Sequence, residues 1–224
     1  MSKEIKRWGL TSLIMFLLMI IMPMYVHAEE TITLKPGESL RISGSASVNV
    51  KDHHDYAIYD GKEAKSYGST YGTNYSIGTS EHLVIHNTST ATQTISTSSN
   101  SFKKIDKPAL KRIKLNKGDN WEYTGGSDFT LPRSHEKAYY NKDGTAYSYG
   151  TDWNTRYTNM PSSEVKRVVL TMGEDQEVYG AYETFKTPQS TDKPAIKRVK
   201  LNKGDNWEYT GGSDFTLPRS HEKA

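Results

Sequence analysis

Residues 106–138 read DKPALKRIKLNKGDNWEYTGGSDFTLPRSHEKA, and residues 192–224 repeat this stretch with two changes. Leu110 is replaced by Ile196, and Ile113 by Val199, so 31 of 33 positions are identical at an offset of 86 residues. Self-similarity at a fixed offset is the signature of a repeated structural unit. The stretch 192–224 is therefore predicted to be a truncated third repeat, near-identical to 106–138.

A weaker copy of the same stretch lies nearer the start of the chain. ITLKPGESLRISG (Ile32–Gly44) aligns with IKLNKGDNWEYTG (Ile113–Gly125), and His54 then falls on His135. Two modules and a partial third follow from this alignment. The expected division is a signal peptide over 1–28, β-module 1 over 29–102, a basic linker over 103–108, β-module 2 over 109–186, a linker over 187–191 and the truncated repeat over 192–224.

Each module reads as short strands separated by turns. Ile32 and Leu34 alternate with polar residues, Pro36-Gly37 turns the chain, and Leu40 and Ile42 alternate again. Further strands are expected at 48–50, 56–59, 83–85 and 92–95. Alternation with period two between turn residues is typical of antiparallel β-structure. The predicted fold class is all-β, with tandem small antiparallel β-sandwich modules of jelly-roll-like type after an N-terminal signal peptide.

The first 28 residues resemble a targeting segment. A basic start (Lys3, Lys6, Arg7) precedes an apolar run over 13–22, and Val26-His27-Ala28 offers small residues before a cleavage site. The alternative is an uncleaved anchor, but the apolar run is about half of the roughly 20 residues that span a bilayer. We expect cleavage near Glu29, a secreted or extracellular location with wall association as an option, and no stable membrane insertion after cleavage.

Composition limits the function classes. The chain of 224 residues contains no Cys, which excludes disulfides, thiolate zinc sites and a cysteine nucleophile. A secreted chain without Cys fits a bacterial exporter better than an animal secretory pathway. The motifs G-x-S-x-G and H-E-x-x-H and a Gly-rich phosphate loop are absent. The chain is therefore expected to be non-catalytic and to need no cofactor.

An aromatic segment recurs in both modules between Gly residues, which predicts loops. Loops on a rigid β-scaffold commonly carry binding functions, and flat aromatic rings stack well on the apolar faces of sugars. The alternative is that these rings cover a core that is poor in aliphatic residues. The candidate ligand-binding residues are Tyr67, Tyr71 and Tyr75 in module 1, with Tyr147, Tyr149, Trp153 and Tyr157 in module 2.

Charge is distributed unevenly along the chain. Residues 29–100 carry five positive and eight negative side chains, whereas residues 101–224 carry 21 and 17. For a secreted bacterial protein, the excess suggests contact with an anionic cell-wall polymer rather than with nucleic acid. The alternative is a linker kept soluble by Lys. The candidate contacts are Lys103, Lys104, Lys107, Lys111, Arg112 and Lys114.

A group of His and acidic residues, Asp52-His53-His54-Asp55, superficially resembles a metal site. Neighbours on a strand point to opposite faces, so at most two of the four side chains can converge. Zinc usually takes three or four ligands. We therefore expect no metal and interpret the group as a local His–carboxylate pair at the surface.

Together these features favour a secreted bacterial repeat protein that binds a cell-surface glycan or an anionic wall polymer. A structural or adhesive component of an extracellular matrix is the first alternative, and a small secreted hydrolase is the second. The near-identity of 192–224 and 106–138 also predicts that the tail could exchange with its twin, giving self-association through 192–224.

Overall fold

The computed structural model describes residues 29–126, 128–208 and 215–217. The predicted signal peptide and most of the distal part of the predicted third repeat lie outside the described residues. Within the described ranges the regular structure consists of β-strands, with no helix. Every strand pair is antiparallel. The prediction of an all-β, β-sandwich-like fold is confirmed.

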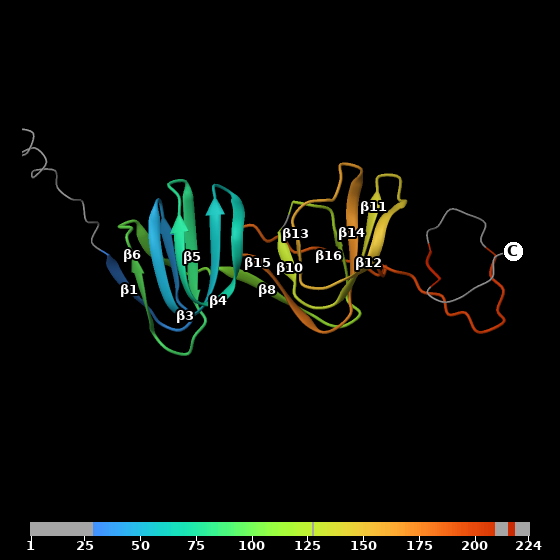
Figure 1. Cartoon of the computed structure of the whole chain (residues 1–224), viewed down its shortest axis with the longest axis horizontal. Helices are drawn as coiled ribbons and strands as arrows, with labels where there is room; N and C mark the ends of the chain where they lie inside the picture. Colours follow the sequence, from blue (N-terminus) through green and yellow to red (C-terminus); the bar gives the residue numbers. More distant parts are fainter. Residues whose placement is uncertain (1–28, 127, 209–214, 218–224) are drawn as a thin grey trace, which may run out of the picture.

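The first half of the chain forms one sheet, seen as the blue-to-green body in Figure 1. Its order is β1-β6-β3-β5-β2-β7, and β4 pairs along β3. The strands are β1 (Glu30–Leu34), β2 (Ser39–Ser43), β3 (Ala46–Asp60), β4 (Glu63–Ile77), β5 (Glu81–Asn87), β6 (Gln93–Thr97) and β7 (Phe102–Ile105).

The second half forms two sheets, in the orders β13-β10-β15-β8 and β12-β11-β14-β9-β16. Figure 1 shows this second body beside the first along the long axis of the molecule. The strands are β8 (Leu110–Leu115), β9 (Asn120–Tyr123), β10 (Phe129–Leu131), β11 (His135–Asn141), β12 (Ala146–Asp152), β13 (Thr155–Tyr157), β14 (Val165–Met172), β15 (Gln176–Ala181) and β16 (Gln189–Ser190).

The order of strand pairing in the first half recurs in the second. The pair β1–β6 corresponds to β8–β15, the pair β3–β5 to β11–β14, and the pair β2–β7 to β9–β16. The long hairpin β3–β4 corresponds to two shorter pairs, β10–β13 and β11–β12. Through this correspondence, residues in the paired strands of one half can be matched to residues in the paired strands of the other.

The long hairpin bends where the shorter pairs separate. The register of β3 and β4 shifts between Val50 and His53, opposite Gly72, whose φ of 49° lies in the left-handed region. Asn154 occupies the corresponding position in the second half and has φ of 48°. A β-bulge of this kind turns a strand from one layer toward the other. One bent strand therefore replaces the two predicted at 48–50 and 56–59.

Each half has its own apolar core. In the first half, Leu34 and Ile95 from β1 and β6 pack in one cluster with Leu40 and Ile85 from β2 and β5. Since these strand pairs lie on opposite sides of β3 in the sheet order, the sheet folds over on itself. The second core is richer in aromatic residues and includes Phe129, which is fully buried.

Two segments differ from the sequence-based expectation. The predicted aromatic loops are strands, β4 in the first half and β12 with β13 in the second. Gly68 packs within β4, because a Cβ there would lie 3.4 Å from the Tyr56 ring. The predicted linker 103–108 begins as part of β7, an edge strand on β2. Lysine on an exposed edge strand discourages further pairing, so a basic segment can still be a strand.

Gly180 in β15 provides a test of this packing. A Cβ at Gly180 would lie 3.0 Å from the Phe185 side chain and against the backbone oxygen of Asp128. Gly180→Ala should lower the free energy of unfolding by about 1–3 kcal/mol through overpacking, measured by urea denaturation. Gly150→Ala is the matched control, because its Cβ would meet nothing within 4 Å. Equal stability of the two variants would contradict the described packing of β15.

Candidate functional site

The seven candidate aromatic residues fall into three groups. Tyr75 and Tyr157 are buried, with 7% and 4% of their surface exposed. They cannot stack on a ligand in this structure and serve as core residues instead. Tyr67 is half-buried where the two halves of the chain meet. The exposed group consists of Tyr71, Tyr147, Tyr149 and Trp153.

The two buried tyrosines belong to matching His–Tyr pairs. His54 Nε2 lies 2.6 Å from the Tyr75 hydroxyl, and His135 Nε2 lies 2.6 Å from that of Tyr157. The other ring nitrogen of His54, Nδ1, lies 2.7 Å from the backbone oxygen of Asp52. A backbone oxygen can only accept, so Nδ1 carries the proton; in the neutral ring Nε2 then accepts from the tyrosine hydroxyl.

Burial keeps both pairs neutral. Desolvation lowers the pKa of His54 and of His135, and it raises the pKa of Tyr75 and of Tyr157. The pairs therefore join the two strands of each bend by a neutral hydrogen bond. The spacing of the two His–Tyr pairs is visible in the sequence, since a His is followed by a Tyr after 21 or 22 residues in both halves. Only the structure shows that the two side chains of each pair form a hydrogen bond.

Tyr71 and Trp153 occupy corresponding positions at the bend of each half. Each is 64% exposed and directly precedes the residue with positive φ. The His53 ring packs edge-on against Tyr71 at 4.8 Å between centroids. Each half therefore presents one large aromatic side chain to solvent at the same place.

The candidate basic residues are not equally available to an anionic polymer. Lys104 is paired with Glu38 at 2.6 Å, and Lys111 donates to Thr187 at 3.2 Å. The Lys107 ammonium lies 5.8 Å from the centre of the Tyr182 ring. Lys103 and Lys114 are exposed.

Arg112 is placed differently from the lysines. It contacts Asp55 of the first half at 2.8 Å, Ser69 at 2.8 Å, and Glu177 of its own half at 2.9 Å. Asp55 is buried, and a buried charge is tolerated only when it is paired. The role that the structure gives Arg112 is to join the two halves.

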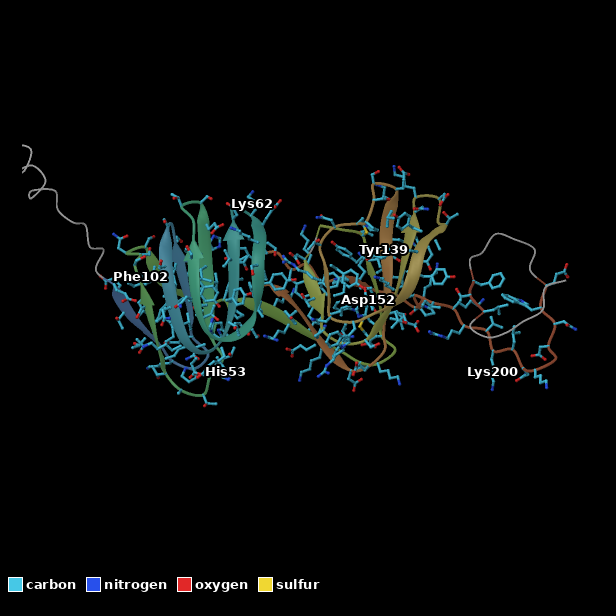
Figure 2. The ribbon with its side chains drawn as sticks, viewed as in Figure 1. His53, Lys62, Phe102, Tyr139, Asp152 and Lys200 are labelled. Carbon is cyan, nitrogen blue, oxygen red and sulfur yellow. The ribbon has the colours of Figure 1, made fainter. Side chains whose placement is uncertain are left out.

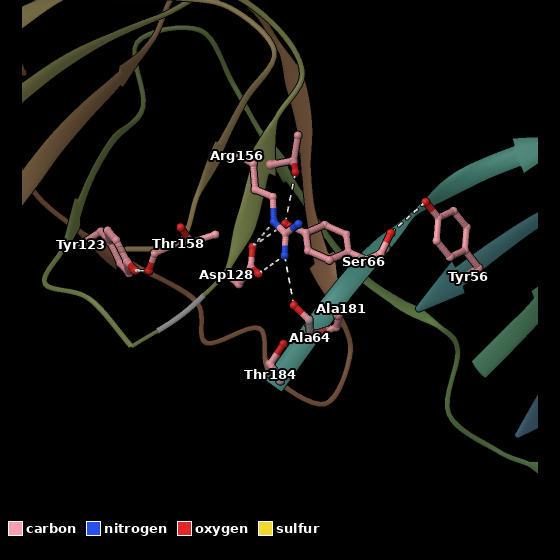
Figure 3. Close-up of polar contacts among 11 residues, drawn as sticks. Tyr56, Ala64, Ser66, Tyr123, Asp128, Arg156, Thr158, Ala181 and Thr184 are labelled. Atoms are coloured by element: carbon pink, nitrogen blue, oxygen red, sulfur yellow. Dashed lines mark hydrogen bonds and ion pairs between the residues drawn. The ribbon is translucent and has the colours of Figure 1, made fainter. Parts of the chain in front are cut away.

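A second set of polar contacts joins the halves beside Arg112. Tyr67 donates to Asp128 at 2.7 Å, and desolvation raises the pKa of its hydroxyl. Arg156 donates to Asp128 and, at 3.1 Å, to the backbone oxygen of Ala64 in the first half, as Figure 3 shows. Its guanidinium also lies 4.6 Å from the centre of the Tyr67 ring. We call all these contacts between the halves the junction.

The described residues contain no group of three or more His and acidic side chains that could hold a metal ion. His53 is exposed, and Figure 2 places it at the edge of the first half, while His54 points into the core. A shallow polar depression lies near Arg41, Ser101 and Phe102. Within the described part of the chain, no helix is long and apolar enough to cross a membrane.

The buried histidines predict a pH-dependent stability. His54 and His135 have pKa values below the ordinary value near 6.5. The unfolded chain therefore binds more protons below about pH 6.5, and the free energy of unfolding should fall as the pH is lowered from 7.5 to 5. Urea denaturation across this range measures the effect. His135→Gln and His54→Gln should each reduce the slope of the profile, because each removes a buried imidazole whose pKa is lowered by desolvation. An unchanged slope in both variants would contradict the assignment.

The junction predicts that two cationic side chains on β8 contribute differently to the free energy of unfolding. Arg112→Ala removes the partner of the buried Asp55 and should lower the free energy of unfolding by about 1–3 kcal/mol. Lys114→Ala, at an exposed position on the same strand, should change it by less than about 0.5 kcal/mol. Denaturant titrations compare the two, and the double variant Arg112→Ala/Asp55→Asn should recover part of the loss. No recovery would show that the ion pair does not carry the effect.

No family model matches the chain, and no curated protein matches it. Three solved structures show a distant likeness. Pumpkin seed globulin is 6% identical with a TM-score of 0.29, over 67% of this chain and 75% of that chain. Vicilin from Capsicum annuum is 7% identical with a TM-score of 0.28, over 72% and 77%. Oxalate decarboxylase from Bacillus subtilis is 8% identical with a TM-score of 0.30, over 72% and 69%.

Proposed function

We propose that this chain is a secreted, non-catalytic bacterial repeat protein that binds a cell-surface glycan through Tyr71 and Trp153. The observation that carries the proposal is their matched placement: two large aromatic rings, equally exposed, at corresponding bends of the two halves. The signal-peptide pattern of residues 1–28 supports export.

The chemistry of such a site follows from the rings themselves. An exposed aromatic ring loses little conformational freedom when it binds, since it has only two rotatable side-chain bonds. It offers a flat apolar face to the C–H face of a sugar. Two such rings, held on a scaffold by strands, fit a ligand that itself repeats, because each ring can engage a separate unit. Tyr147 and Tyr149, also exposed on β12, can widen the surface in the second half.

The anionic-polymer version of this proposal has less support from the side chains. Arg112 and Lys104 are engaged with carboxylates, which leaves Lys103 and Lys114 as exposed cations on either side of the junction. We propose these two lysines as auxiliary contacts rather than as the main binding residues.

A structural or adhesive role is the second candidate, and the junction favours it. Arg112, Tyr67 and Arg156 fix the first half against the second through side-chain contacts with defined partners. A fixed junction suits a protein whose repeats set spacing or rigidity. In this role the modules would act through their number and arrangement, and exposed aromatic rings would not be needed.

Removing the two rings distinguishes these candidates. The variant Tyr71→Ala/Trp153→Ala should lose retention on immobilised cell-wall glycan by at least tenfold, since stacking on an aromatic side chain contributes roughly 1–3 kcal/mol in nucleic-acid cases. Retention is measured by elution from a cell-wall column, with circular dichroism confirming the fold. The matched control is Phe102→Ala, which removes an exposed aromatic ring on β7 rather than at a bend and should retain glycan binding.

Unchanged retention of the double variant would remove the two rings from the binding surface. Retention that falls in Lys103→Ala/Lys114→Ala and depends steeply on salt, but not in the aromatic variant, would instead support an anionic polymer as ligand.

A further inference from the structure

The tail of the chain presents apolar residues to solvent that its twin keeps in the core. Trp121 is buried with 6% of its surface exposed, whereas the matching Trp207 is 48% exposed. Leu115 and Leu201 differ in the same way, with 6% and 40% exposed. The described residues of the tail form no strand. Near-identical sequences thus stand in different environments, because β14 and β15 pair with the first copy whereas no described strand pairs with the second.

The tail nevertheless contacts the second half. The residues that make this contact match those through which the second half contacts the first. Ala109 packs in a cluster with Ala57 and Val84 of the first half. Ala195 packs in a cluster with Ala138 and Val169 of the second. In strand register, Ala57 pairs with Val84, and Ala138 pairs with Val169. The same small apolar contact therefore occurs twice.

The polar contacts recur in the same places. Arg112 pairs with Asp55, and the matching Arg198 pairs with Glu136, which corresponds to Asp55. The Tyr67 hydroxyl lies 3.2 Å from the Thr130 hydroxyl. Its counterpart Tyr149 lies 3.0 Å from that of Thr216, 86 residues beyond Thr130. Three contacts of one junction are thus reproduced in a second junction by corresponding residues.

Among the residues that the structure describes, the second junction has fewer contacts than the first. In the first junction, residues from β13 and β15 and from the turn that follows also contribute, through Arg156, Tyr179 and Glu183. The sequence contains this closing half, residues 139–190, once, and it is already paired with β8, β9 and β10. A second copy could cover the tail only by uncovering its own residues 106–138. After such an exchange each chain would still have one uncovered copy of this sequence, either 106–138 or 192–224.

The opposite end of the molecule does not offer the missing half. The positions in the first half that correspond to Arg112, Arg156 and Tyr179 are held by small polar residues, namely Thr31, Asn74 and Ser96. A polar outer face is typical of the terminal repeat of an array. The first half therefore cannot supply the arginine and aromatic contacts that the second junction lacks.

We infer that residues 192–208 and 215–217, together with the face of the second half formed by Glu136, Ala138, Tyr149 and Val169, are an open docking site for a β-stranded polypeptide segment of the type of residues 139–190. Such a segment brings a β15-like strand between the two tail stretches that match β8 and β10. It buries Leu201 and Trp207, as β14 and β15 bury Leu115 and Trp121 in the first copy. The junction is then a head-to-tail contact that can be extended in one direction.

The test is to supply the segment. The full chain is compared with the same chain carrying a second copy of residues 139–191 after Ala224. The amides of residues 196–208, which lie on the tail beyond the second half (Figure 2), should exchange with deuterium about 100-fold more slowly in the extended chain. The matched control is the same extension with Gly180→Val in the added copy. Gly180 has no room for a side chain, so protection should be lost while the amides of β14 stay protected.

Two results would overturn the inference. The first is fast exchange of 196–208 in the extended chain with β14 intact, because a fitting segment would then have failed to dock. The second is protection of 196–208 in the unextended chain that rises with protein concentration and accompanies a dimer on a sizing column, because the occupant would then be a second copy. Neither result bears on glycan retention by Tyr71 and Trp153, so failure here is distinguishable from failure of the proposed function.

Discussion

The two halves of the chain are held together by a carboxylate that water does not reach. Asp55 is buried; its charge is balanced by Arg112 from the other half, and it accepts a hydrogen bond from the Ser69 hydroxyl. Separating the halves would leave this charge either unpaired or newly hydrated, together with the apolar contact of Ala109 against Ala57. Small β-units bury a limited share of their surface and are marginal alone. The junction adds buried contacts that neither half can make by itself.

The β-strands follow from the sequence because alternation is a direct signal: the alternating pairs Ile32/Leu34 and Leu40/Ile42 lie in β1 and β2. The truncated third repeat inferred from the offset of 86 residues stays a prediction, since the described residues of the tail form no strand. The bend was not predictable, because Gly72 and Asn154 reach the same backbone conformation with different residue types. Gly within an aromatic stretch predicts a loop. In the structure Gly68 makes room for the Tyr56 ring across the hairpin.

The site residues were less predictable than the fold, for a physical reason. Tyr71 and Tyr75 lie on the same strand four residues apart, yet one is exposed and the other buried. Alternation alone would give them the same face, but the bulge at Gly72 reverses the order between them. Likewise, Arg112 and Lys114 are both positively charged and both lie on β8. Only the position of Asp55 in the other half separates their roles.

The path of the chain through the second half determines how it would respond to tension. β8 starts where β15 ends, since Leu110 pairs with Ala181, and Tyr182 donates to the backbone oxygen of Ala109 at 2.9 Å. Tension between the first half and the tail would first break the contacts of Ala195 and Arg198 with the second half, and would then peel the two-residue strand β16 from β9. It would then open the β8–β15 ladder from this end, one hydrogen bond after another, rather than shearing all of them at once. The β8–β15 ladder is therefore expected to resist tension less than the same ladder would if its two strands were pulled in shear.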